Sequence, residues 1–247
     1  MKRFIGYFDL MGYKQFIMNN DTPEARRRLE HVLRDIETSL GRGEYLDTPR
    51  GYVADLSRST LRSLSISDTI IFWTQDDSDA SLEEFLDVCY RLNWSLNTYN
   101  FPVKGLMTYD EMELIQGSDR NDNGGSYSVN TMYGKGLVNA HLKCDEQNWA
   151  GTTVDAALSD CIEAKGLTPL LERVAIKTMV PYKRPPENQT EEYALRLVSK
   201  PLNEQAFQNL QRDIRRVFEA DHKGLNARAA EMLNNTLLFA EKFKEPS

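Results

Sequence analysis

Short apolar runs and amphipathic stretches alternate along the chain, and their periods predict both strands and helices. Apolar residues that alternate with polar ones or form short bounded runs are typical of strands. The strands predicted in this way cover residues 3–9, two short runs within 61–73 around a polar turn at Asp68, 102–109, and a pair within 173–184 and 191–199.

Longer stretches repeat their apolar residues at helical spacing. The clearest covers residues 22–40, with Thr22 expected as the N-cap, Pro23 in the first turn and Gly41 at the end. Further helices are predicted through 82–92, from 133 to 147, over 152–165, and as two amphipathic helices in the last forty residues. Residues 44–58 and the glycine-rich segment 117–126 are expected to be loops.

The order of these elements predicts an α+β fold, a sandwich with its helices on one face of an antiparallel sheet. We expect residues 1–200 to form one catalytic domain and residues 201–247 to form a C-terminal helical extension packed on the domain or the dimer. A chain of 247 residues with 40% hydrophobic residues is long enough for such a core.

The charge and the cysteine content exclude several classes of function. A formal net charge of −7 argues against binding to nucleic acid polymers or to anionic membranes, although a local basic pocket could still bind a phosphorylated small molecule. Three dispersed cysteines and three histidines give no metal-finger spacing. Asp9 interrupts the first apolar run too early for a signal peptide, and no apolar run is long enough to span a membrane, so we expect a cytoplasmic protein.

Two aspartates stand where neighbouring strands end. Asp9 closes the first strand and Asp68 lies in the turn of the next strand pair, so an antiparallel sheet could place them side by side. Two adjacent carboxylates repel each other unless a cation neutralises them, and hard divalent cations prefer such oxygen ligands. We therefore predict that Asp9 and Asp68 hold Mg²⁺ or Mn²⁺, with the carbonyl of Leu10 as a further ligand. Taken singly, each aspartate is more often just a turn former.

Three motifs resemble the class III nucleotide cyclases. "FDLMGYKQF" is similar to their first metal-binding motif, "SISDTIIFW" to the hairpin with their second metal-binding aspartate, and "GLVNAHLK" to their helix signature. The match spans residues 4–143 in the family's order. The segments "CDEQNWAGTTVD" and "VPYK" make the chain most similar to the pyrimidine cyclases of the bacterial Pycsar antiphage systems.

The resemblance implies roles for individual residues. Asn139 would orient the ribose and Lys143, one helical turn later, would stabilise charge on the α-phosphate. Lys104 and Lys183 become candidates for binding the triphosphate. The family uses two Mg²⁺ or Mn²⁺ ions in each active site, and it builds that site across a homodimer.

The chain also departs from the family at informative positions. Leu64 and Met132 stand where purine cyclases have the polar residues that read the base, which indicates a different base, with Arg62, Thr131 and Tyr52 as candidate contacts. Lys143 replaces the usual arginine, and lysine lacks the bidentate fork of a guanidinium group.

The resemblance therefore implies a uridylate cyclase that converts UTP to 3′,5′-cyclic UMP and pyrophosphate. Cyclic UMP would be a second messenger that a separate effector protein binds in antiphage defence. The alternatives are a cytidylate cyclase that uses CTP and a catalytically inactive, cyclase-like nucleotide sensor. A different two-metal enzyme, such as a cyclic-dinucleotide synthase, is less favoured because no GG[DE][DE]F-like hairpin occurs at 65–69.

Overall fold

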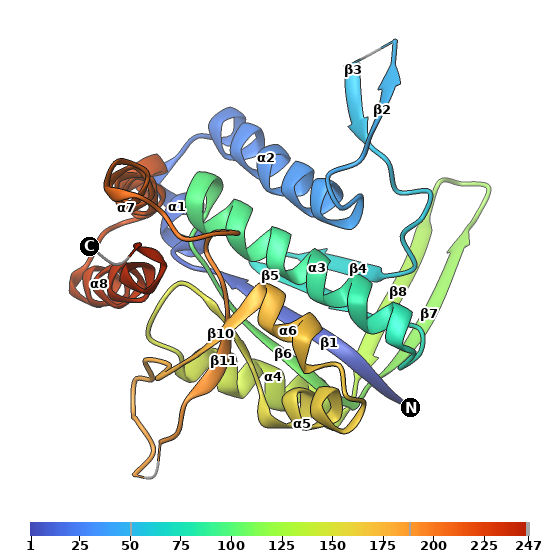
Figure 1. Ribbon diagram of the computed structural model, residues 1–247. Helices are drawn as coiled ribbons and strands as arrows, with labels where there is room; N and C mark the ends of the chain where they lie inside the picture. The colour runs from blue at the N-terminus through green and yellow to red at the C-terminus, as the bar shows by residue number, and fades with distance from the viewer. Residues whose placement is uncertain (50, 188, 246–247) are drawn as a thin grey trace.

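A seven-stranded sheet forms the centre of the protein, seen here in a computed structural model that describes residues 1–49, 51–187 and 189–245. Its strand order is β10-β11-β9-β6-β1-β5-β4, and neighbours are antiparallel except β6 and β9. The strands are β1 (Lys2–Leu10), β4 (Arg62–Ile66), β5 (Thr69–Trp73), β6 (Val103–Glu111), β9 (Thr152–Val154), β10 (Ala175–Thr178) and β11 (Glu192–Leu195). Strand β1 lies between β6 and β5, so its end is enclosed by both neighbouring strands (Figure 1).

Eight α-helices surround this sheet in the described part of the chain. They are α1 (Tyr13–Asn19), α2 (Thr22–Leu40), α3 (Asp79–Ser95), α4 (Lys135–Glu146), α5 (Ala156–Ala164), α6 (Thr168–Val174), α7 (Glu204–Glu219) and α8 (Ala227–Ala240). A π-helical turn, Leu96–Asn100, extends α3. No described helix has the length and apolarity needed to cross a membrane.

Helices cover both faces of the sheet, so the expectation that they lie on one face is wrong. Phe4 and Phe8 of β1 point into a core with α2 and α3, whereas Ile5 and Tyr7 point to the opposite face, where α4 packs. Successive strand residues face opposite sides, so a strand buried on both faces is an unbroken apolar run. The run from Phe4 to Phe8 is therefore the local sign of a doubly covered strand.

Several predicted elements are confirmed with small shifts. The helix over 22–40 has its predicted bounds, but Asp21 is the N-cap, since its side chain accepts a hydrogen bond from the Glu24 amide at 2.9 Å. The hairpin around Asp68 and the β10–β11 pair form as predicted. The helix expected from residue 152 begins only at Ala156, because Thr152–Val154 join the sheet as β9.

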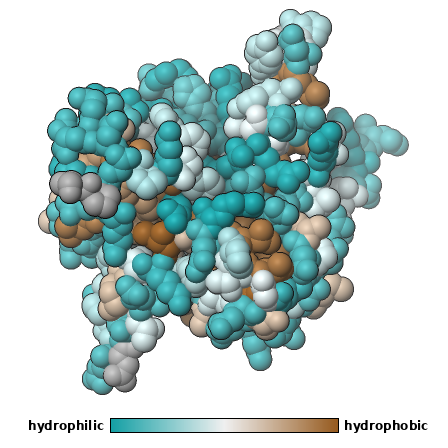
Figure 2. All heavy atoms as spheres, viewed as in Figure 1, coloured by the Kyte–Doolittle hydropathy of each residue, from teal (hydrophilic) through white to brown (hydrophobic). Residues whose placement is uncertain are grey.

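Both segments expected to be loops contain hairpins. Residues 44–58 include β2 (Tyr45–Thr48) and β3 (Gly51–Ala54). Segment 117–126 covers the end of β7 (Glu113–Arg120), the connecting turn at 121–125 and the first residue of β8 (Ser126–Tyr133). Most side chains of these strands are exposed, so the hairpins show no apolar pattern and depend on their ladder hydrogen bonds. They project from the body in Figure 1, and in Figure 2 hydrophilic residues cover most of this face of the molecule.

The C-terminal helices share a core with the rest of the chain. Trp149 is fully buried and meets Phe239 of α8 edge to face, with 4.6 Å between the ring centroids. The Ala150 amide donates to the hydroxyl of Thr236 at 2.8 Å. Helix α8 thus packs on the segment before β9, while the division into a catalytic domain and an extension near residue 200 stays a prediction.

Candidate active site

Asp9 and Asp68 lie side by side where β1 ends. Asp9 stands opposite Thr69 in the register of β1 and β5, and the Leu10 amide donates to the Asp68 carbonyl at 2.8 Å. The turn is tight because Ser67 has a φ of 56°, in the left-handed region. The structure therefore brings together the three predicted metal-site residues.

Lys104 forms the third component of this site. It stands opposite Asp9 in the register of β1 and β6, is only 5% exposed, and places its Nζ 3.2 Å from Asp9 Oδ2. The same Nζ lies 3.3 Å from Asp145 Oδ1, and Lys183 Nζ lies 3.0 Å from Asp145 Oδ2. Charges of alternating sign thus run from Asp9 through Lys104 and Asp145 to Lys183.

Burial perturbs the titration of these groups. Burial raises the pKa of Asp9, the nearby Asp68 adds to the rise, and Lys104 opposes it. Burial lowers the pKa of Lys104, but the combined attraction of Asp9 and other nearby acidic groups, Asp145 among them, raises it overall. Burial likewise opposes the fall in the pKa of Asp145, which Lys183 and Lys104 cause. A further cation beside Asp9 would favour the ionised form of its carboxyl group.

The donor set fits a hard divalent cation whose shell is completed by a ligand. Among the described residues, no group of three or more His, Cys, Asp and Glu side chains is arranged to hold a metal ion. The chain offers two carboxylates, and Mg²⁺ commonly binds through one or two carboxylates together with water and substrate phosphates. Asp9 and Asp68 therefore suit an ion that arrives with a phosphorylated ligand.

A pocket of about 260 Å³ opens at these carboxylates. Its walls come from the end of β1, from Lys104, from the start of α1 and from the start of α8. Gly12 precedes α1 with a φ of 80°, so a glycine at this position lets the chain turn directly after the metal-site strand.

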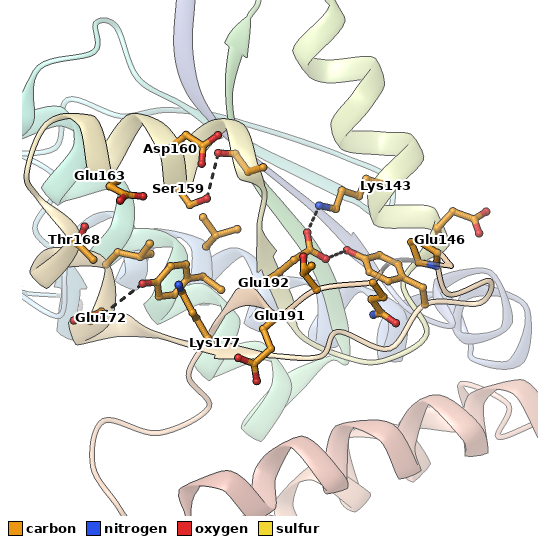
Figure 3. A pocket seen from close by; sticks show the side chains of 18 of the residues that line it. Lys143, Glu146, Ser159, Asp160, Glu163, Thr168, Glu172, Lys177, Glu191 and Glu192 are labelled. Atoms are coloured by element: carbon orange, nitrogen blue, oxygen red, sulfur yellow. Dashed lines mark hydrogen bonds and ion pairs between the residues drawn. The ribbon is translucent and has the colours of Figure 1, made fainter.

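The predicted catalytic pair on α4 lies elsewhere. Lys143 lines a second and larger cavity of about 880 Å³, bordered by α4, α5, α6 and the β10–β11 pair. There it forms an ion pair with Glu192, which also accepts a hydrogen bond of 2.5 Å from the hydroxyl of Tyr182 (Figure 3). Asn139, one turn earlier, is exposed. One chain by itself does not bring Lys143 to Asp9 and Asp68.

The candidate base-contacting residues line neither of these two pockets and are spread over β3, β4 and β8. Leu64 on β4 and Met132 on β8 are partly buried and pack against the same apolar cluster, which includes Ile5 and Tyr7. Arg62 is exposed at the start of β4. Thr131 and Tyr52 are exposed on the projecting hairpins.

Sequence reasoning missed Asp145 and Glu192, the partners of Lys104, Lys183 and Lys143. Neither carries a local signal, since Asp145 is one of two adjacent acidic residues at the end of α4 and Glu192 begins a short strand. Their partners are 38 to 49 residues away in the chain, so only tertiary contacts identify them.

No protein-family model and no curated protein sequence matches this chain. Among solved structures, the catalytic core of a rhodopsin-guanylyl cyclase with converted specificity, in complex with ATPαS, matches with a TM-score of 0.50 at 8% identity, covering 78% of this chain and 94% of that chain. The dimeric guanylyl cyclase domain of a fusion protein from the aquatic fungus Blastocladiella emersonii gives 0.49 at 7% identity over 78% and 95%. The adenylyl cyclase CyaB from P. aeruginosa gives 0.47 at 10% identity over 79% and 93%.

The first of these similarities establishes the fold. The chain has the α+β architecture of class III nucleotide cyclase domains, an antiparallel sheet with packed helices. This confirms the fold class predicted from the sequence.

Proposed function

We propose that this protein is a nucleotide cyclase that converts a pyrimidine nucleoside triphosphate to its 3′,5′-cyclic monophosphate and pyrophosphate. The observation that carries the proposal is the pairing of Asp9 with Asp68 at the end of β1, beside the buried Lys104, on a cyclase-like fold. An aspartate that only stabilises a turn needs neither a second carboxylate nor a buried lysine beside it.

The two aspartates and the Leu10 carbonyl would hold two Mg²⁺ or Mn²⁺ ions. When bound, the ions would lower the pKa of the ribose 3′-hydroxyl and neutralise phosphate charge. Lys104 keeps Asp9 ionised and adds positive charge beside it, and Lys183 extends this charge toward the surface. Both lysines are therefore proposed to attract the triphosphate.

The reaction is an in-line displacement at the α-phosphorus. The 3′-oxygen forms a bond to that phosphorus while the bond to the oxygen bridging to the β-phosphorus breaks, and pyrophosphate leaves. The hydroxyl proton passes to solvent or to the departing pyrophosphate. Lys143 is proposed to stabilise the charge that develops on the α-phosphate oxygens, and Asn139 to orient the ribose.

These two residues reach the aspartates only if a second subunit supplies them. In one chain Lys143 lies in the cavity with Glu192, apart from the pocket of Asp9 and Asp68. A homodimer with two equivalent composite sites would bring the groups together. In that dimer the Lys143 ammonium group must exchange Glu192 for a phosphate.

For the base we favour uracil, with cytosine as the alternative. The partly buried Leu64 and Met132 give an apolar surface at the positions where the resemblance places purine-reading polar groups. Arg62 is retained as a candidate base contact. The cyclic product would act as a second messenger, and by resemblance to the Pycsar cyclases a separate effector would bind it during antiphage defence.

The decisive experiment compares the four nucleotides. Purified protein is incubated with ATP, GTP, CTP or UTP and Mn²⁺, and the products are identified by mass spectrometry, with Asp68→Ala as the control. We expect cyclic UMP, lost in Asp68→Ala. Cyclic AMP or cyclic GMP would refute the proposed base, and no product from any nucleotide would favour the sensor.

The shared site has its own test. Asp68→Ala and Lys143→Ala should each be inactive, and mixing the two proteins should restore part of the activity, because a mixed dimer contains one intact site. Absence of any recovery, with mixed dimers verified by tagged pull-down, would exclude the composite site.

The second candidate function is a nucleotide sensor without catalysis. The ion pair between Lys143 and Glu192 favours it, because that pair neutralises the proposed catalytic cation within its own chain. A sensor would bind UTP with Mn²⁺ and yield no cyclic product, whereas the cyclase would consume the UTP.

A further inference from the structure

The pocket at Asp9 and Asp68 has one wall that belongs to the C-terminal extension. Asn226, the N-cap of α8, and Arg228 and Met232, from its first two turns, line it together with the two aspartates. Figure 1 places the two C-terminal helices beside α1, next to the end of β1. Residues more than two hundred positions apart in the sequence thus form one pocket.

The turn before α8 is fastened to the N-terminal part of the chain. Arg28 of α2 donates to the Asp221 carboxylate at 2.6 Å, and Asn20 donates to the Asp221 carbonyl at 2.7 Å. Asn19 donates to the carbonyl of His222 at 2.8 Å. Asp221 and His222 have φ values of 58° and 53°, a strained conformation that non-glycine residues keep only where surrounding contacts hold it.

The buried Lys223 also stabilises this turn. It is 3% exposed, and its Nζ donates to the carbonyls of Val217 and Ala220, each at 3.1 Å, and to the Asp221 carboxylate at 3.0 Å. A Cβ on Gly12 would lie 3.2 Å from the Lys223 carbonyl oxygen. The start of α8 is therefore held against the segment that follows Asp9, and Lys223 has a structural role.

Two cations of the pocket remain available to a ligand. Lys14 of α1 and Arg228 of α8 both line it, both are exposed, and neither forms a hydrogen bond or ion pair with any residue that the structure describes. The other two, Lys104 and Lys223, are engaged with Asp9 and with Asp221. Unpaired cations that share a pocket with paired carboxylates suit a metal-bound phosphate chain, whose outer oxygens need partners beyond the metal.

We propose that Arg228, assisted by Lys14, binds the outer phosphate oxygens of the nucleoside triphosphate, which makes α8 a part of the substrate site. The inference rests on the proposed function for the identity of the ligand. A guanidinium group can contact two phosphate oxygens at once, which a lysine cannot do. The extension would then position the leaving pyrophosphate group as well as pack on the domain.

The test measures binding of inorganic tripolyphosphate with Mn²⁺ to the full chain by isothermal titration calorimetry. Arg228→Gln should raise the Kd about tenfold, the effect of losing one charge-assisted contact. Arg228→Lys should give an intermediate value. Arg215→Gln is the matched control, since Arg215 is an exposed, unpaired arginine of α7, within the described residues, that does not line this pocket; its Kd should stay within twofold of the wild type.

An unchanged Kd in Arg228→Gln, or no binding of tripolyphosphate by the wild type, would overturn the inference. Equal losses in Arg228→Gln and Arg215→Gln would also overturn it, because they indicate only general charge attraction. The probe contains no base and no ribose and cannot be cyclised. Failure of the cyclase assay therefore leaves this test intact, and the two proposals can fail separately.

Discussion

Lys104 is the position where the structure makes its sharpest energetic prediction. Lys104→Met keeps the buried aliphatic stem and removes only the ammonium group, so packing in β6 is largely preserved. The substitution leaves the partly buried Asp9 beside Asp68 without its cation. We expect the free energy of unfolding to fall.

The distance between Asp9 and Lys104 sets the size of this loss of stability. Two unit charges 3.2 Å apart attract by about 5 kcal/mol at an effective dielectric constant of about 20. Breaking a buried pair from one side typically costs about 3–5 kcal/mol, because the remaining charge stays buried. The Asp9 side chain is 29% exposed, so water recovers part of this loss. We therefore expect Lys104→Met to cost about 2–3 kcal/mol near neutral pH.

Urea-induced unfolding of four proteins at pH 7.5 separates this pair from its surroundings. The set is the wild type, Lys104→Met, Asp9→Asn and the double variant, and the double-mutant cycle gives the coupling energy. We expect a coupling of at least about 1 kcal/mol. A loss below about 0.5 kcal/mol in Lys104→Met, or a coupling of zero within error, would refute the view that Lys104 sustains the charge of Asp9.

Three further predictions concern the framework around the site. Gly134→Ala should lower the free energy of unfolding in urea by at least about 3 kcal/mol, since its Cβ would lie 2.3 Å from the Glu111 carbonyl oxygen at a φ of 143°. The control Gly124→Ala has open space around its Cβ and should cost about 1 kcal/mol. Equal losses in the two variants would contradict this reasoning. Burial raises the pKa of Asp155 above 3.8, so the folded chain holds that proton more tightly than the unfolded chain, and the wild type loses stability as the pH rises from about 3.8 through the folded pKa. Asp155→Asn keeps an N-cap residue and lacks this loss, so its unfolding free energy relative to the wild type should increase over that range, and a difference that does not change with pH would refute the assignment. Trp149→Ala should cost about 3–5 kcal/mol, because the ring is fully buried against α8, and a loss below about 1 kcal/mol would indicate that the C-terminal helices contribute little to stability.

The sequence by itself determined the elements whose signal is local. The apolar run that ends in Asp9, the polar turn at Asp68 and the period of residues 22–40 depend on neighbours a few positions apart, and each forms where it was predicted. The register of an antiparallel pair follows from such patterns, so the proximity of Asp9 and Asp68 could also be predicted. The projecting hairpins escaped prediction because exposed strands carry no apolar alternation.

Tertiary structure alone decided which charges meet. Lys104 faces Asp9 because β6 pairs with β1 in one particular register. Lys143 of α4 meets Glu192 because the fold places the end of α4 and the start of β11 at one cavity. Arg228 reaches the pocket because contacts between α2 and the turn at Asp221 fix the start of α8. These partners are between 49 and more than two hundred residues apart. Their meeting depends on packing across the whole chain, which no short sequence period encodes.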